Sequence, residues 1–355
     1  MRIKKFKIII LLGIVLLFSC SKDKNFGEVN TEDTDYRYGK GVFIINEGNY
    51  SNGNGSVSFY NLYTNKMYNG IFDASNKRPL GDVPISSEII NGLIYVIVNN
   101  SGKVEVVNPE DFKSLKTITG FASPRFILPI NNKKAYVSDL RSNYISVIDL
   151  ESNTISKKIY CGKSTDRMLK YNNKVFVCNW SSYYVNAPNN SIQVIDSDID
   201  CLIDSVIIGK EPNSLVLDNQ NRLWVLSSGG YNNEEYPELN CINTNSLKIE
   251  KKIQFASKNL SPQSLCINQK GDTIWYLNNN IYCMSINDNY LPLFPIIYKR
   301  NHLFYAMTVN SQNNELYISD AIDYNQNGYF YRFSAAGIVI DSLRAGIIPG
   351  YFCFN

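Results

Sequence analysis

The feature of this sequence that most restricts its fold is an internal repeat of about 45 residues, which occurs seven times. One copy reads AYVSD from Ala135 and then YISVIDL from Tyr144, and the next reads VFVCN from Val175 and then SIQVIDS from Ser191. Short β-type segments at this period are typical of a propeller, in which each repeat forms one four-stranded blade. We therefore predict an all-β, seven-bladed β-propeller over residues 41–355.

Equivalent strands can be followed from one repeat to the next. They are rich in β-branched and aromatic residues and are bounded by turn residues such as Asn, Gly, Asp and Ser. The second strand of each repeat begins at Val42, Ile94, Ala135, Val175, Leu223, Ile274 and Leu316. An innermost strand precedes it, often after a proline.

The two ends of the repeat region complement each other. The closing sequence IIPGYFCFN resembles an innermost strand that no second strand follows, whereas VFIIN at Val42 has no innermost strand before it. We therefore predict that Phe352–Phe354 pair with the strand at Val42 and close the ring.

The first residues predict a secretion signal. Basic residues precede an apolar run over residues 8–18, which is shorter than the stretch of about 20 apolar residues that spans a membrane. The sequence Leu17-Phe18-Ser19-Cys20 resembles a bacterial lipobox. We predict a lipoprotein signal peptide over residues 1–19, lipidation of Cys20, and a flexible tether over residues 20–40. The alternative is an ordinary secretory signal with an incidental cysteine.

Charge and residue counts disfavour some classes of function. Removing residues 1–19 takes away four basic side chains and no acidic one, so the formal charge of +3 falls close to zero. A near-neutral surface gives no electrostatic footprint for nucleic acid, and we expect no nucleic-acid partner.

Motifs for catalysis and metal binding are missing from the sequence. His302 is the only histidine, and neither G-x-S-x-G nor H-E-x-x-H occurs. Because proton transfer in enzymes commonly uses histidine, we expect no enzyme activity, no catalytic residues and no cofactor. The segment Asp323–Gly328 matches the first half of a calcium loop but lacks the glutamate at the twelfth position. It predicts a turn rather than a metal site.

Loops at one end of the propeller hold the candidate ligand-binding residues. The connections from second to third strands, and from fourth strands to the next innermost strands, lie on the same face. They carry aromatic rings, side-chain amides and a few charges, which suit a bulky polar ligand. The predicted ligand-binding residues are Asn46, Glu47, Tyr50, Arg125, Asp139, Arg167, Asn179, Trp180, Asn213, Tyr231, Gln263 and Tyr351.

The two arginines in this set require partners of opposite charge. Acceptors are supplied either by Glu47, Asp139 and Asp320 or by a phosphate of the ligand. In the alternative interpretation, the arginines form a salt-bridge network that holds adjacent blades together.

Three parts of the sequence carry a resemblance to a known family. They are the opening GVFIINEGNYSNGNGSVSFYN from Gly41, the third strands that end in V-I-D, and the closing IPGYFCFN. Over Gly41–Asn355 the chain resembles the YncE-like seven-bladed propeller lipoproteins of Bacteroidetes, including those with the DUF5074 type of repeat. This group includes the surface cobalamin-binding proteins of the BtuG type, which capture corrinoids and cover a TonB-dependent outer-membrane transporter.

The resemblance implies that the protein captures a scarce nutrient outside the cell. We expect an outer-membrane, surface-exposed lipoprotein that hands a corrinoid such as vitamin B12 to a TonB-dependent transporter. The corrinoid would be a bound ligand rather than a cofactor. Two alternatives stay open, namely a glycan- or peptide-binding partner of another transporter and a propeller lactonase or lyase.

Overall fold

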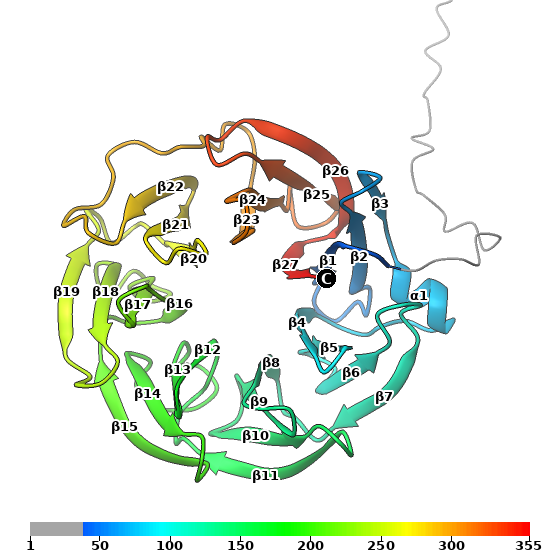
Figure 1. Cartoon of the computed structure of the whole chain (residues 1–355), viewed down its shortest axis with the longest axis horizontal. Helices are drawn as coiled ribbons and strands as arrows, with labels where there is room; N and C mark the ends of the chain where they lie inside the picture. The colour runs from blue at the N-terminus through cyan, green and yellow to red at the C-terminus, as the bar shows by residue number, and fades with distance from the viewer. Residues whose placement is uncertain (1–37) are drawn as a thin grey trace, which may run out of the picture.

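The computed structural model describes residues 38–355, and these residues form seven β-sheets arranged as a ring (Figure 1). The first sheet combines β1 (Gly41–Asn46), β2 (Ser56–Asn61) and β3 (Lys66–Tyr68) with the C-terminal β27 (Pro349–Phe354). The second comprises β4 (Pro84–Ile90), β5 (Leu93–Val98), β6 (Lys103–Val107) and β7 (Ser114–Thr119). The third comprises β8 (Pro124–Pro129), β9 (Lys134–Asp139), β10 (Tyr144–Asp149) and β11 (Thr154–Tyr160).

The remaining sheets follow the same order around the ring. They are β12 (Met168–Tyr171), β13 (Lys174–Cys178), β14 (Ser191–Asp196) and β15 (Cys201–Ile207), and then β16 (Pro212–Leu217), β17 (Arg222–Ser227), β18 (Glu238–Asn243) and β19 (Ile249–Gln254). The sixth comprises β20 (Gln263–Ile267), β21 (Thr273–Asn278) and β22 (Asn280–Ser285), and the seventh β23 (Phe304–Val309), β24 (Leu316–Asp320), β25 (Asn327–Phe333) and β26 (Val339–Ile347). The seven-bladed propeller predicted from the repeat is therefore confirmed.

The ring closes through its two ends, as the sequence predicted. The C-terminal strand β27 is antiparallel to β1, with Phe354 opposite Val42 and Phe352 opposite Ile44. In Figure 1 the red end of the chain lies against the blue first strand. The first blade is thus completed by the last strand.

The sixth blade has three strands rather than the four that the sequence analysis expected. The segment after β22 contains Pro292 and Pro295, which have no N–H to donate to a neighbouring strand. It pairs with the sheet at an isolated bridge between Ile281 and Ile297 and does not form a fourth strand.

The hydrophobic core lies between neighbouring blades. One cluster joins Tyr95 and Ile97 of β5 to Val137 of β9. A helix that the sequence analysis did not predict, α1 (Ile71–Asn76), buries Ile71 and Phe72 in another cluster.

The described chain begins at Tyr38. Although Tyr38 falls in the segment assigned to the tether, its ring is buried against Phe59 and Phe112, with ring centroids 5.0 and 5.9 Å apart. The signal peptide, Cys20 and the tether up to residue 37 lie outside the described residues. Among the residues from 38 onwards, no helix is long and apolar enough to cross a membrane.

Candidate ligand-binding site

One position of the repeat builds the site. The residue at the start of each innermost strand, which follows a proline in five of the seven blades, contributes to one cavity. These seven residues, which we call the mouth ring, are Ile85, Arg125, Arg167, Asn213, Gln263, Tyr305 and Gly350. The cavity has a volume of about 540 Å3 and lies at the end of the propeller where the innermost strands begin.

Local backbone irregularities accompany the mouth ring. The pairing of the innermost with the second strand shifts by one residue beside the ring position in six blades. Such bulges re-aim side chains and occur often next to binding sites. Val83, Glu211 and Ile348, which precede three of the prolines, have φ values of 54°, 55° and 52°. A left-handed backbone at a non-glycine residue is strained, and residues of this kind occur often at functional sites.

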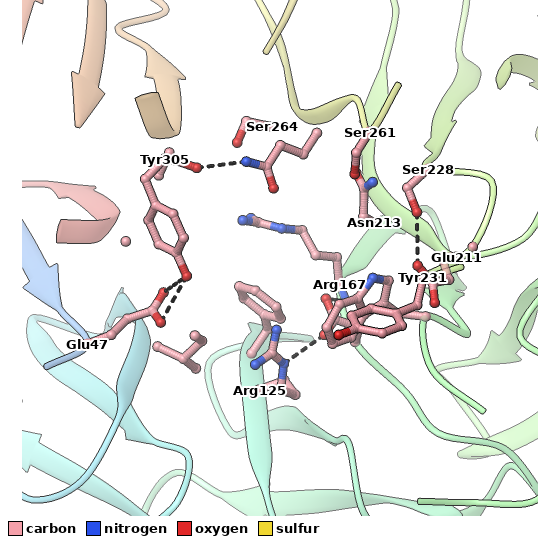
Figure 2. A pocket seen from close by; sticks show the side chains of 18 of the residues that line it. Glu47, Arg125, Arg167, Glu211, Asn213, Ser228, Tyr231, Ser261, Ser264 and Tyr305 are labelled. Carbon is pink, nitrogen blue, oxygen red and sulfur yellow. Dashed lines mark hydrogen bonds and ion pairs between the residues drawn. The ribbon is translucent and has the colours of Figure 1, made fainter. Parts of the chain in front are cut away.

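Two arginines of the ring differ in their partners (Figure 2). The Arg125 Nε lies 2.7 Å from the Asp166 carboxylate, and its guanidinium lies 5.2 Å from the centre of the Trp180 ring. The Arg167 guanidinium lies 4.4 Å from the centre of the Phe126 ring. The Arg125 charge is therefore largely compensated, whereas Arg167 is held mainly by aromatic faces.

A half-buried carboxyl group, that of Glu47, faces Arg125 across the cavity. The Tyr305 hydroxyl donates to both carboxylate oxygens of Glu47, each at 3.0 Å. Burial raises the pKa of Glu47 to about 7, although the Tyr305 hydrogen bond and the Arg125 charge act against this rise. A side chain at Gly350 would overlap the Glu47 carboxylate as it lies here, so a larger residue at this ring position would displace the Glu47 side chain.

Amides and hydroxyls complete the wall. Gln263 donates to the Tyr305 carbonyl at 2.9 Å, and Asn213 donates to the Pro262 carbonyl at 2.8 Å. On the wall beside Tyr231, the Ser228 hydroxyl donates to Glu211 at 3.0 Å. The cavity thus offers cations, hydrogen-bonding groups and aromatic faces, which are groups that bind and orient a polar ligand.

Seven of the twelve predicted site residues line this cavity. They are Glu47, Arg125, Arg167, Trp180, Asn213, Tyr231 and Gln263. Their convergence places them where a ligand could be contacted, and their role in binding stays a prediction.

Three predicted residues are not in the cavity wall, because their side chains are used inside the blades. Asn46 donates to Ser58 at 2.9 Å and accepts from the Gly346 N–H. Asp139 accepts the backbone N–H groups of residues 122 and 123, each at 2.9 Å. Asn179 donates to the Gln193 amide at 2.8 Å. All three stand at the end of a second strand and are almost fully buried, so they hold loops in place instead of facing a ligand.

The other two predicted residues lie on either side of the cavity. Tyr50 is 64% exposed and lies outside the wall. Tyr351 follows the ring residue Gly350 by one position, so its side chain lines a smaller cavity of about 110 Å3 along the inner strands.

Four charged or aromatic residues of the wall are not among the predicted ligand-binding residues. They are Asp166, Glu211, Tyr305 and Phe126. The sequence does place Tyr305 and Asp166 in loops at this end of the propeller, since each stands at or beside the repeat position that Arg125 and Arg167 occupy. His302, the only histidine, is not part of the wall; its Nδ1 lies 2.8 Å from Asp320.

The chain matches one known protein family, and its fold is similar to several solved structures. The family model of the domain of unknown function DUF5074 matches residues 40–342. The chain belongs to the DUF5074 family. No curated protein sequence matches it.

Solved structures of other proteins share the architecture. A quinonprotein alcohol dehydrogenase-like protein from Bacteroides thetaiotaomicron superposes with a TM-score of 0.67 at 17% identity, and the match covers 90% of this chain and 79% of that one. A functionally unknown protein from Desulfotomaculum acetoxidans gives 0.64 at 14% identity, with 89% and 99% covered. Hydrazine synthase from Kuenenia stuttgartiensis gives 0.59 at 13% identity, with 76% and 89% covered. At these identities the likeness concerns the fold alone.

Proposed function

We propose that this DUF5074 propeller captures a bulky polar nutrient in the cavity enclosed by the mouth ring. The observation that carries the proposal is the convergence of one residue from each blade on one cavity, including two arginines and two side-chain amides. Packing between blades uses only some of these large polar residues: Arg125 pairs with Asp166 of the next blade, whereas Arg167 has no ion pair of this kind within residues 38–355. Their presence at one repeat position supports a binding role.

A corrinoid such as vitamin B12 is the ligand that we favour. Its macrocycle carries several amide side chains and presents flat faces, so it requires dispersed hydrogen-bonding partners and aromatic surfaces. Gln263 and Asn213 supply amides, and Trp180 and Tyr231 supply rings at the same cavity. Part of a corrinoid would enter the mouth while the rest stayed outside it.

The lipobox at Cys20 and the family resemblance support the cellular setting. We propose a lipid anchor in the outer membrane, display on the cell surface, and transfer of the ligand to a TonB-dependent transporter. Diacylation together with an N-terminal acyl chain exceeds the two hydrophobic signals that stable anchoring requires.

A glycan is the second candidate, because aromatic side chains stand exposed on the same face. Tyr231 is 89% exposed at the cavity wall, and Tyr183 is 85% exposed on the loop after β13. Exposed rings of this kind can stack on sugar faces. The same cavity would then serve a different transporter.

Calorimetric titration distinguishes these candidates. Cyanocobalamin added to the purified protein without its lipid should bind in a one-to-one complex that keeps the red colour through gel filtration. Acidic and neutral oligosaccharides, titrated in parallel, should give no heat. Absence of cyanocobalamin binding would contradict the corrinoid assignment, and oligosaccharide binding in its place would favour the glycan.

A further inference from the structure

Arg167 lies at the floor of the mouth without an acidic partner. It borders both the mouth cavity and the smaller cavity beneath it. Its guanidinium lies over the rings of Phe126 and Tyr351, at 4.4 and 5.5 Å from their centres. Within residues 38–355, no carboxylate lies at ion-pair distance from it.

Arg125, the neighbouring arginine of the mouth ring, has the acidic partner that Arg167 lacks. Arg125 pairs with Asp166 at 2.7 Å and is also attracted by Glu47. The Arg167 cation is attracted by aromatic faces rather than by a carboxylate. A guanidinium has five N–H donors in a planar fork, so most of them are left for another acceptor.

We propose that Arg167 anchors an oxyanion subsite, so that the captured ligand carries a phosphate, phosphodiester or carboxylate group. In Figure 2 the Arg167 side chain extends into the middle of the cavity. Ser264 also borders both cavities, and its hydroxyl can donate to the same anion. The fork geometry of arginine matches the paired oxygens of these groups, and partial burial strengthens the attraction.

This inference rests on the proposed function, because it assigns a charge to the ligand of the same cavity. It also limits the ligand class, since a neutral sugar or a neutral corrinoid fragment would leave the Arg167 charge without a partner. Two sources of the oxyanion fit the proposed function. They are the phosphodiester of a complete corrinoid and the carboxylate of an acidic sugar.

Whether the oxyanion is the phosphodiester of a corrinoid is tested with two ligands, of which only one carries that group. Cyanocobalamin contains the phosphodiester, and dicyanocobinamide lacks it together with the nucleotide. Arg167→Gln should weaken cyanocobalamin binding about tenfold to a hundredfold, as expected for the loss of a charged hydrogen-bonding partner. Dicyanocobinamide binding should change by less than about twofold. Arg167→Lys, which keeps the charge without the fork, should lose less affinity for cyanocobalamin than Arg167→Gln.

Arg141→Gln is the matched control. Arg141 lies on the same face outside the cavity wall, where its guanidinium stacks 4.5 Å from the centre of the Tyr184 ring. This variant should bind both corrinoids like the wild type, and melting curves show that each variant is folded. Equal weakening of both corrinoids by Arg167→Gln, or no weakening of either, would overturn the subsite.

A second experiment tests the oxyanion subsite independently of the corrinoid assignment. If cyanocobalamin does not bind to the wild type, the corrinoid part of the proposed function fails, and inorganic phosphate and glucuronate become the probes. Either anion should raise the melting temperature of the wild type and Arg141→Gln but not that of Arg167→Gln. A shift with glucuronate alone would identify a carboxylate subsite. No shift in the wild type, or equal shifts in all three proteins, would overturn the inference.

Discussion

At the scale of single residues, Glu47 makes the stability of the protein depend on pH. Its carboxyl group is held between the Tyr305 hydroxyl and Arg125, and burial raises its pKa to about 7. Because the folded protein holds this proton more tightly than the unfolded chain, the resulting stabilisation is complete below the normal glutamate pKa. It is lost as the pH rises through about 7.

Replacement of Glu47 removes this pH dependence. Relative to the wild type, Glu47→Gln should gain about 1–3 kcal/mol in free energy of unfolding between pH 5 and pH 8.5, since the amide never ionises. Urea unfolding at both pH values measures the difference. Glu315→Gln is the control, because hydrogen bonds from Arg332 keep the Glu315 carboxylate ionised throughout this range and lower its pKa against the effect of burial. A pH-independent effect of Glu47→Gln would contradict the raised pKa.

At the scale of structural elements, the closure of the ring explains the two sequence motifs that open and end the propeller. The N–H groups of Glu47 and Gly48 donate to the carbonyls of Ile348 and Ile347, at 2.9 and 3.0 Å. The loop after β1 is thereby tied to the start of β27, and it brings Glu47 beside Gly350. The same contacts that close the ring therefore form part of the mouth.

Two glycines of this loop test the tight packing at the closure. Gly48 has a φ of 70°, and a side chain there would overlap Asn54 and lie 2.7 Å from the Gly55 nitrogen. Gly53 has a φ of 63° but open space around it. Gly53→Ala should cost about 1 kcal/mol for the left-handed backbone, and Gly48→Ala about 1–2 kcal/mol more for the overlap. Equal losses in urea unfolding would show that the loop can relax around the added methyl group.

The elements themselves were predictable because each strand has a local signal. The β-branched runs from Val42 to Leu316 recur in register, and both ends of the chain showed complementary gaps. The site was only partly predictable, because it depends on single-residue offsets that the backbone bulges introduce. Tyr351 illustrates this. It was predicted to line the mouth, but its neighbour Gly350 occupies the ring position, and the Tyr351 side chain lines the smaller cavity. The burial of Asn179 depends on partners such as Gln193, which no local pattern indicates.

At the scale of the whole molecule, the propeller separates the mouth from the point where the described chain enters. Strand β1 runs from this entry point towards Glu47 at the mouth, and the Asn355 side chain donates to the Tyr38 carbonyl at the opposite end, at 2.8 Å. The described chain therefore begins at the face opposite to the mouth, which is where the predicted tether would attach. A lipid anchor on that tether would not need to cover the ligand site.

The anchor itself is tested by changing the predicted lipidation site. Cys20→Ala, which lies outside the described residues, should release the protein from membranes or leave it as an uncleaved precursor, because no thiol remains to be acylated. Cell fractionation and the mass of the purified protein measure both outcomes. A mature form that stayed in the membrane would contradict the lipoprotein prediction.

Ligand binding at the mouth is tested most directly by the loss of one aromatic side chain. Trp180 lines the cavity beside Arg125, whereas Tyr63 is 78% exposed in the turn between β2 and β3, at the opposite end of the blades. Cyanocobalamin is titrated by calorimetry into the wild type, Trp180→Ala and Tyr63→Ala. Trp180→Ala should weaken binding by about 1–3 kcal/mol with little change in melting temperature, and Tyr63→Ala should bind like the wild type. Unchanged affinity in Trp180→Ala, or a large loss of stability with affinity intact, would place the site elsewhere.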